Sequence, residues 1–255
     1  MTSNVKPTVD GGLQSVLAAL NVLECFAESE ELGVTDLARR IGVAKSTAHR
    51  LLTTLCARGL AERDAETGRY RLGLKLYELG QLAISRNQIR QKAMPLLQEL
   101  HQATGATIHL AVPDGSDVVY LERLTTTNAA SAFPQIARRM PAHCTSSGKA
   151  IAAFDPRVAS ARSLAGFAPM TGNSIHSARQ YALALTQTRR QGYAVNLDEA
   201  LAGWSSVAAP VLAHDGSARA AISIVGRSGR VRDDVDRPAR LVRLAAQRLA
   251  KQLCL

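Results

Sequence analysis

The spacing of apolar residues predicts three helices near the start of the chain. Residues 13–28 show apolar positions at three- and four-residue intervals, the pattern of an amphipathic helix. These positions are Val16, Leu17, Leu20, Leu23 and Ala27. A second, short helix is expected to be capped by Thr35 and to end at Ile41, where Gly42 permits a sharp turn. A third helix follows and is expected to end near Gly59.

The second and third helices match a helix-turn-helix unit, in which a short turn containing glycine joins two helices. Such a unit needs a small residue where the helices cross, a turn glycine and apolar contacts on both sides. The positions that meet these needs are Leu37, Ala38, Ile41, Gly42, Val43, Ala48 and Leu51. A helical hairpin in another kind of core needs apolar positions but not this combination. The spacing therefore favours a DNA-binding unit.

The polar and apolar pattern changes after residue 59. Residues 60–73 alternate around the turn "DAETG", which predicts a β-hairpin of the kind called a wing. Arg63, Arg69 and Arg71 are expected at its tip, where they would suit phosphates or the minor groove. Residues 74–87 return to helical spacing, with an apolar stripe at Leu76, Leu79, Leu82 and Ala83, and are expected to form a linker helix.

The remainder of the chain mixes helices and strands. A helix is expected over residues 88–104, interrupted early by Pro95, and another over residues 233–253. Between them, "ATIHLAV" and "VVYLERL" flank a turn, as do "SSVAAPVLA" and "ARAAISIVG", which predicts two hairpins. We expect an α+β protein with a mostly antiparallel sheet, divided into residues 1–73, a linker at 74–88, and residues 89–255.

The net charge of the chain indicates the kind of partner it binds. The 255-residue chain carries a net charge of +10, which points to a polyanion. Residues 39–71 hold eight Lys or Arg against three Asp or Glu, and this basic segment begins with Arg39 and Arg40 beside the predicted turn. The apolar runs are too short to cross a bilayer, so a cytoplasmic protein without membrane contact is expected.

The four cysteines and most histidines and acids suggest no catalytic centre. Cys25, Cys56, Cys144 and Cys254 are widely and irregularly spaced, so reduced thiols are expected, with no metal and no cofactor. His101, His109, His176 and His214 are scattered and receive no role. Asp198 and Glu199 are adjacent on an irregular segment and are expected to be solvated or salt-bridged.

The segment "HCTSSGKA" at residues 143–150 holds the strongest candidate for chemistry. Ser146 and Lys149 have an S-x-x-K spacing, but a β-lactamase-like acyl-enzyme would also need S-D-N and K-T-G, which the chain lacks. A phosphate-binding loop would need an earlier glycine and a final hydroxyl. A helix that opens at Ser146, Ser147 and Gly148 would instead favour a bound carboxylate through its free N–H groups.

Several separated motifs closely resemble the isocitrate lyase regulator (IclR) family of bacterial transcription factors. They are "VTDLARRIGVAKSTAHRLLTTLCARGLAERDAETGRYRLGLKLYELG", "HCTSSGKA", "GYAVNLDEALAGWSSVAAPV" and "AAISIVG", in the family's order. The resemblance implies an N-terminal winged helix-turn-helix that binds double-stranded operator DNA, and a C-terminal effector-binding domain of GAF-like α/β fold. It also implies a homodimer or a tetramer built as a dimer of dimers.

The resemblance also implies site residues. Lys45, Ser46, Thr47, His49 and Arg50 would lie in the N-terminal half of a recognition helix, facing bases and phosphates. Carried over by position, the effector pocket would use Ser146, Ser147, Asn196, Ser206 and Ser223. Some relatives have an acid at Asn196, a thiol at Ser206 and a serine at Val225, so the effector itself is left open.

Trp204 is the only tryptophan, and in a strand it would point to the same side as Ser206. An aromatic wall beside a carboxylate-binding helix start suggests an aromatic or short aliphatic acid as the effector. We therefore expect an effector-responsive transcriptional regulator, a repressor, and not an enzyme. The alternative from another class is a small-molecule hydrolase or sensor enzyme with an accessory helix-turn-helix.

Overall fold

A computed structural model describes residues 13–27, 29–125 and 138–254. The chain divides into two compact units, Met1–Ile84 and Ser85–Leu255, which we call the N-terminal and C-terminal domains. The division falls at the end of the helix that the sequence predicts as a linker. Both helices and strands contribute to each unit, as predicted.

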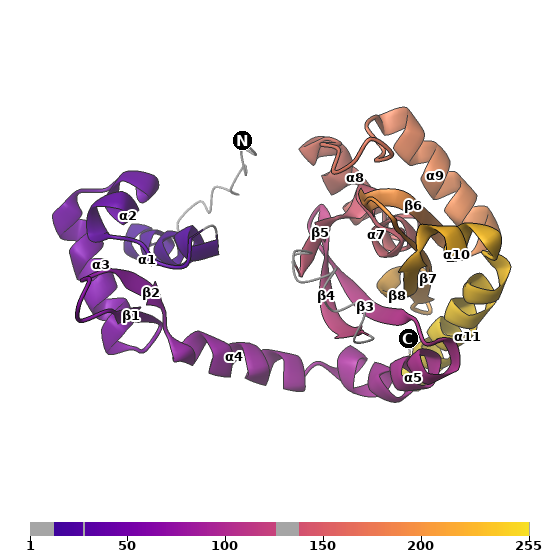
Figure 1. Cartoon of the computed structure of the whole chain (residues 1–255), viewed down its shortest axis with the longest axis horizontal. Helices are drawn as coiled ribbons and strands as arrows, with labels where there is room; N and C mark the ends of the chain where they lie inside the picture. Colours follow the sequence, from indigo (N-terminus) through magenta and orange to yellow (C-terminus); the bar gives the residue numbers. More distant parts are fainter. Residues whose placement is uncertain (1–12, 28, 126–137, 255) are drawn as a thin grey trace. The chain divides into compact units, whose positions relative to one another are not determined.

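The N-terminal domain is a winged helix-turn-helix (Figure 1). Its elements are α1 (Gln14–Glu24), the 3-10 turn η1 (Cys25–Ala27), α2 (Val34–Ile41), α3 (Lys45–Ala57), β1 (Ala61–Arg63), β2 (Tyr70–Leu72) and α4 (Leu74–Ser85). Strands β1 and β2 pair antiparallel, and Leu32 adds a bridge to Tyr70. The predicted third helix, hairpin and linker helix are all present.

The turn between α2 and α3 depends on one glycine. Gly42 has a φ of +70°, which is strained for other residues, and its N–H donates to the carbonyl of Ala38. The predicted cap at Thr35 is wrong. The helix begins earlier, because the carbonyl of Gly33 already accepts from the N–H of Leu37 at 3.0 Å, and Thr35 lies inside the first turn.

The predicted apolar face of α1 is correct at Leu23, which packs against the core, but wrong at other positions. Val22 and Phe26 are buried in the core of this domain, whereas Val16 and Leu20 are each 51% exposed. The residues that contact this core keep helical spacing, but their stripe is centred on Val22 and not on Leu20; they are Ala19, Val22, Leu23 and Phe26. Glu28, the predicted end of the helix, lies outside the described residues. None of the residues of α4 is buried among the described residues, and of its apolar stripe only Leu76 is half-buried.

The C-terminal domain contains a six-stranded sheet and its covering helices. Its elements are α5 (Gln88–Thr104), β3 (Thr107–Asp114), β4 (Asp117–Leu124), β5 (Arg139–Pro141), η2 (Ala142–Cys144), α7 (Ser146–Ala152), α8 (Pro156–Ala165), α9 (Ala178–Gln191), β6 (Ala194–Leu201), β7 (Trp204–Leu212), β8 (Ala218–Arg227), α10 (Ser228–Asp233) and α11 (Asp236–Leu253). The strand order is β5-β4-β3-β8-β7-β6, with antiparallel pairs throughout.

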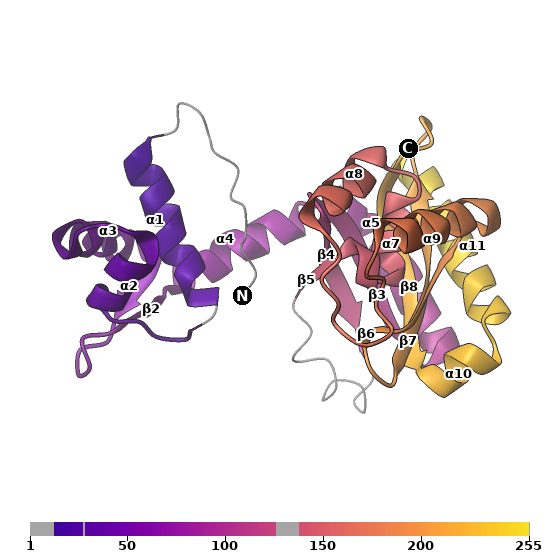
Figure 2. The same ribbon diagram turned by 90° about the horizontal axis from the view of Figure 1, so that it is seen from above.

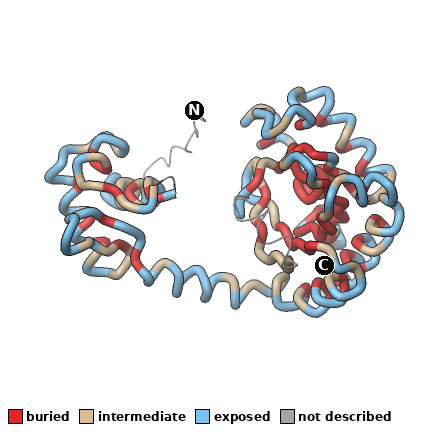
Figure 3. Tube along the Cα trace, in the orientation of Figure 1, coloured by how far each residue is buried: buried red, intermediate tan, exposed pale blue. Residues whose placement is uncertain are grey.

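Helices cover both faces of this sheet, so the domain has three layers (Figure 2). Helices α5 and α11 pack on one face, where Ile108, Ile222 and Val207 belong to a shared core. Helices α7, α8 and α9 pack on the other, around Ile151 and Tyr181. Buried residues gather along the central strands in Figure 3. Alternate residues of the same strands therefore face two different cores, as the period of a strand requires.

The predicted helix over residues 88–104 is present as α5, but Pro95 lies inside it and does not interrupt it. The helix starts at a capping residue, because the side chain of Asn87 accepts from the N–H of Arg90 at 3.0 Å. The predicted terminal helix over residues 233–253 is present as α11, and the short α10, which the sequence did not predict, precedes it.

Candidate functional site

The N-terminal half of α3 presents its polar residues to solvent. Its exposed residues there are Lys45, Ser46, Thr47, His49 and Arg50. Ala48, between them, is fully buried, and Leu52 one turn later is buried as well. This alternation fixes which side of the helix packs in the core. The five polar side chains predicted to contact DNA therefore share the exposed side of one helix.

The other four predicted DNA contacts have partners within the domain. Arg39 pairs with Asp36 at 2.7 Å, and Arg40 donates to the carbonyl of Cys25 and the hydroxyl of Ser29. Arg69 donates to the carbonyl of Glu31 at 3.1 Å, and Arg71 pairs with Glu62 at 3.1 Å. These pairs are exposed, and an exposed pair contributes about 0–1 kcal/mol. Arg39, Arg69 and Arg71 can therefore exchange a carboxylate for a phosphate, whereas Arg40 would release a carbonyl and a hydroxyl group.

The tip of the wing is not made of arginine, contrary to expectation. Asp64 forms the turn, because its carboxylate accepts from the N–H groups of Glu66 and Thr67, and Gly68 follows with a φ of +66°. The arginines lie on or next to the two strands instead. Arg63 sits 5.9 Å from the centre of the Tyr70 ring. The predicted turn "DAETG" is present at residues 64–68, between the two strands.

In the C-terminal domain, four of the predicted effector residues surround one small cavity, which we call the effector pocket. Asn196, Trp204, Ser206 and Ser223 line it, and its other lining residues are His109, Tyr120, Met140, Thr145, Ala200, Leu201, Ser205 and Val225. The enclosed volume is about 30 Å³, enough for water but far below the several hundred Å³ of a typical ligand site.

Ser146 and Ser147 do not line this cavity but lie beside it. The hydroxyls of Ser146 and Ser206 are hydrogen-bonded at 2.7 Å, which ties α7 to β7. The hydroxyl of Ser147 is buried and has no partner in the described residues. Asn196 is used at both ends of its amide: it donates to the carbonyl of Cys144 at 3.1 Å and accepts from the N–H of Glu199 at 2.8 Å.

The start of α7 differs from expectation. Thr145 is the capping residue, and its hydroxyl accepts from the N–H of Gly148 at 3.0 Å. That N–H group is therefore not free to bind a carboxylate, and the expectation is wrong at this residue. Gly148 serves close packing instead, because a Cβ atom there would lie 2.3 Å from the Cα atom of Ala142.

Sequence reasoning missed His109 and Tyr120, which form one wall of the effector pocket. Their rings meet edge to face, with centres 4.8 Å apart. Burial, and secondarily the charge of Arg123, lowers the pKa of His109 to about 3, so its imidazole is neutral. Burial raises the pKa of Tyr120 to about 12, so its hydroxyl stays protonated. His109 reaches the effector pocket because β3 pairs with β8, which sets His109 opposite Ser223. No local feature of the sequence indicates this position.

Asp198 and Glu199 both form salt bridges, which is one of the two alternatives that the sequence predicts. Asp198 pairs with Arg232 at 2.7 Å, and hydrogen bonds from Ser228 and Arg232 help to lower the pKa of its carboxyl group. Glu199 pairs with Lys149 at 2.5 Å, and both side chains are buried. The lysine of the S-x-x-K spacing is thus committed to an ion pair and does not face Ser146 as a base.

Neither a metal centre nor a membrane segment appears in the described residues. No group of three or more His, Cys, Asp or Glu side chains lies close enough there to hold a metal ion. Within the same ranges, no helix combines the length and the apolar character needed to span a bilayer. None of the four cysteines forms a disulfide bond in the described residues.

A winged helix-turn-helix with an exposed polar helix, together with a domain that encloses a pocket of hydroxyl and amide groups, defines a ligand-responsive transcriptional regulator. Comparison with known proteins agrees. The family model "Bacterial transcriptional regulator IclR C-terminal" matches residues 81–251, and "IclR helix-turn-helix domain" matches residues 15–65. The chain belongs to the IclR family of bacterial transcriptional regulators.

Individual relatives are similar over most of the chain. The HTH-type transcriptional regulator XynR of Escherichia coli is 40% identical over 224 residues, covering 87% of this chain and 89% of that protein. The regulator KdgR of the same species is 31% identical over 214 residues, covering 83% and 81%. These relatives are regulators, and this chain is a regulator rather than an enzyme.

Solved structures share the fold. The IclR protein of Thermotoga maritima has a TM-score of 0.72 at 25% identity and covers 94% of this chain and 99% of its own. An IclR homologue from Microbacterium hydrocarbonoxydans, solved with 4-hydroxybenzoate, has a TM-score of 0.78 at 26% identity and covers 94% and 98%. The mixed architecture with a helix-turn-helix at the N-terminus is therefore that of the family.

Proposed function

We propose that this cytoplasmic regulator is a repressor that binds operator DNA through the N-terminal half of α3 and releases it when an organic acid occupies the effector pocket. The observation that carries the DNA contact is the exposure of five polar side chains around the fully buried Ala48. A helix of this kind enters the major groove with its N-terminal residues against the bases. The exposed arginines of the wing suit the neighbouring phosphates.

The effector is proposed to be an aromatic or short aliphatic carboxylic acid. Hydroxyl groups of Ser206 and Ser223, the Asn196 amide and the neutral His109 ring offer polar contacts, while Tyr120 and Trp204 offer flat apolar surface. A homologue binds 4-hydroxybenzoate, which has this chemistry. Because the pocket encloses only about 30 Å³, an acid of this size must displace lining side chains as it binds.

The pocket residues come from all six strands of the sheet and from the capping residue of α7, so such a displacement reaches most of the domain. We propose that two or four chains assemble, since the exposed Val16 and Leu20 of α1 and the unburied α4 offer apolar surface for a second copy. Paired recognition helices would then match two half-sites of the operator.

The DNA contact is tested by titrating the upstream promoter of the gene with the full chain. Arg50→Ala is expected to lose about 1–3 kcal/mol of specific binding, because a base or phosphate contact is removed. Arg58→Ala is the matched control, since Arg58 is exposed at the far end of the same helix. Equal affinity of Arg50→Ala and wild type would remove Arg50 from the interface.

The effector pocket is tested with 4-hydroxybenzoate and a panel of short aliphatic acids. An acid that releases the promoter is expected to change the emission of Trp204 in saturable fashion. Trp204→Ala should bind DNA but lose most of the response, whereas Trp204→Phe, which keeps an aromatic wall, should retain it. An active acid that leaves the emission unchanged and acts normally on Trp204→Ala would place the pocket elsewhere.

A further inference from the structure

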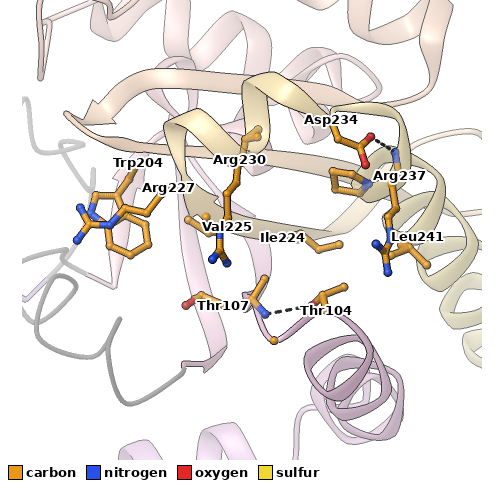
Figure 4. Close-up of a pocket in the computed structure, with 15 residues that line it drawn as sticks. Thr104, Thr107, Trp204, Ile224, Val225, Arg227, Arg230, Asp234, Arg237 and Leu241 are labelled. Carbon is orange, nitrogen blue, oxygen red and sulfur yellow. Dashed lines mark hydrogen bonds between the residues drawn. The ribbon is translucent and has the colours of Figure 1, made fainter.

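A second, larger hollow lies at the end of the sheet, outside the effector pocket. Its volume is about 600 Å³, within the range of small-molecule sites. We call it the arginine groove, and it is lined by residues 104–107 of the turn into β3, by Trp204, by residues 224–227 of β8, and by Arg230, Val231, Asp234, Arg237, Pro238 and Leu241 of the following helices. Figure 4 shows these side chains around it.

The groove results from unequal strand lengths. Strand β3 begins at Thr107, which pairs with Val225, but β8 continues for two more residues to Arg227. Gly105, with a φ of +59°, turns the chain away from α5 just before this point. The end of β8 therefore has no neighbour on the β3 side, and α10 and the start of α11 close the hollow from the other side.

Three arginines line this hollow and are spaced along its length (Figure 4). Arg227 lies 4.6 Å from the centre of the Trp204 ring. Arg230 extends from α10 across the groove toward Val225 and Thr107 (Figure 4), and Arg237 lines the opposite end. No ion pair joins any of the three to a carboxylate in the described residues, whereas seven other arginines of this domain have such a partner.

The remaining lining distinguishes this groove from a simple basic surface. Its floor is apolar, with Ile224, Val225, Val231 and Leu241. Asp234 is the only acid among the lining residues, and its carboxylate already accepts from the N–H of Arg237 at 3.0 Å.

One lining residue also has an unsatisfied polar group. Thr107 is 2% exposed, and its hydroxyl has no hydrogen-bond partner in the described part of the chain. Buried hydroxyls of folded proteins are usually hydrogen-bonded, so this one is an exception among the described residues.

We propose that the arginine groove is a second ligand site, which takes a small organic molecule with an apolar body and at least two negative charges. Guanidinium groups bind carboxylate, phosphate and sulfonate oxygens through paired N–H donors. The apolar floor would bury the body of the ligand, which a DNA phosphate backbone does not offer. This favours a small molecule over nucleic acid for the groove.

The wider charge pattern agrees with this assignment. Residues 219–251 hold nine Lys or Arg against three Asp, a larger excess than in the segment 39–71 that suggested DNA. Three of these nine basic residues, Arg227, Arg230 and Arg237, line the groove. An anion approaching it is attracted before contact, because summed charges focus potential in clefts.

The experiment uses calorimetric titration of the full chain with naphthalene-1,5-disulfonate, which joins an apolar double ring to two anionic groups. Binding of one probe per chain is expected. Sodium sulfate at equal ionic strength should bind at least about tenfold more weakly, because it lacks the apolar body. No binding of the disulfonate to wild type at concentrations up to about 10 mM would overturn the proposal.

Variants locate the bound probe. Arg230→Glu is expected to weaken disulfonate binding by at least about tenfold, the loss typical of a charged hydrogen bond. Arg240→Glu makes the same charge change on an exposed residue of α11 outside the groove and should stay within about twofold of wild type. Equal losses in both variants would indicate general charge attraction, and no loss in Arg230→Glu would place the probe elsewhere; either result overturns the proposal.

Sedimentation of the same proteins tests the competing occupant, a second copy of the chain. Wild type and Arg230→Glu are expected to share one oligomeric state. If Arg230→Glu instead changes the oligomeric state and wild type does not bind the disulfonate, the groove is an interface between chains. Because the probe need not release DNA, failure here leaves the test of the effector pocket with 4-hydroxybenzoate unaffected.

Discussion

Replacing Lys149 by methionine is expected to destabilise the C-terminal domain strongly. The Lys149 and Glu199 side chains are only 5% and 11% exposed, and the Nζ to Oε1 distance is 2.5 Å. The second carboxylate oxygen of Glu199 is buried without a hydrogen-bond partner in the described residues. Removing the lysine therefore leaves an uncompensated buried charge, which typically costs about 3–5 kcal/mol.

The assay is equilibrium urea unfolding followed by the emission of Trp204, which reports on this domain alone because it is the only tryptophan. Arg248→Met is the matched control. It breaks the pair with Glu99, whose side chains are 55% and 60% exposed, and should cost no more than about 1 kcal/mol. A loss in Lys149→Met as small as in this control would refute the reasoning.

A double variant distinguishes two causes of the stability loss: the broken ion pair and the changed packing of the lysine side chain. Lys149→Met with Glu199→Leu replaces both charges by apolar groups and should recover much of the stability, because paired replacement is often nearly neutral. If the double variant is as unstable as Lys149→Met, the loss comes from the shape of the side chain and not from the stranded carboxylate.

The pH dependence of Lys149→Met has a definite sign. Burial already raises the pKa of Glu199 in the folded protein, and loss of the neighbouring cation raises it further. The folded variant then binds a proton at a higher pH than the unfolded chain, whose glutamate pKa is about 4.3. Its stability deficit should shrink as the pH falls from 7 toward 5.

Three further predictions concern single residues. Gly148→Ala should cost about 1–3 kcal/mol or more in urea unfolding, because its Cβ atom would lie 2.3 Å from the Cα atom of Ala142. Gly172→Ala is the control, because a Cβ atom there has no other atom within 4 Å. Equal stability of the two variants would show that close packing does not require a glycine at residue 148. Arg69→Ala should weaken binding to all DNA sequences alike and lower the salt slope by about one unit, whereas loss confined to one operator base would make Arg69 a base reader. His109 has a folded pKa of about 3 against about 6.5 unfolded, so the unfolded state binds more protons and stability is lost as the pH falls below about 6.5. His109→Gln should flatten this dependence between pH 7 and 5, and an unchanged slope would mean that the imidazole is not buried in its neutral form.

The sequence was most informative where structure is local. The helix-turn-helix follows from short-range spacing and from one glycine, Gly42, whose positive φ the turn requires. The face of α1 was misjudged because this helix offers two overlapping apolar stripes with helical spacing, and only the one with Val22 and Phe26 faces the core. Spacing alone does not choose between two such stripes.

The effector pocket was predictable only in part, for a related reason. Asn196, Ser206 and Ser223 were located by resemblance, but His109 and Tyr120 reach the cavity through strand pairing between distant segments. The pairing of His109 with Ser223 joins residues more than a hundred positions apart, and no local pattern encodes it. The arginine groove depends in the same way on where β3 ends relative to β8.

Trp204 lines both the effector pocket and the arginine groove, and Val225 does so as well. A ligand that shifts the indole to enter one cavity changes the wall that the other ligand meets. Thermodynamic linkage requires this influence to be reciprocal, so each ligand alters the affinity of the other by the same factor. Promoter occupancy would then depend on the combination of two metabolite concentrations, with a single tryptophan as the element that couples them.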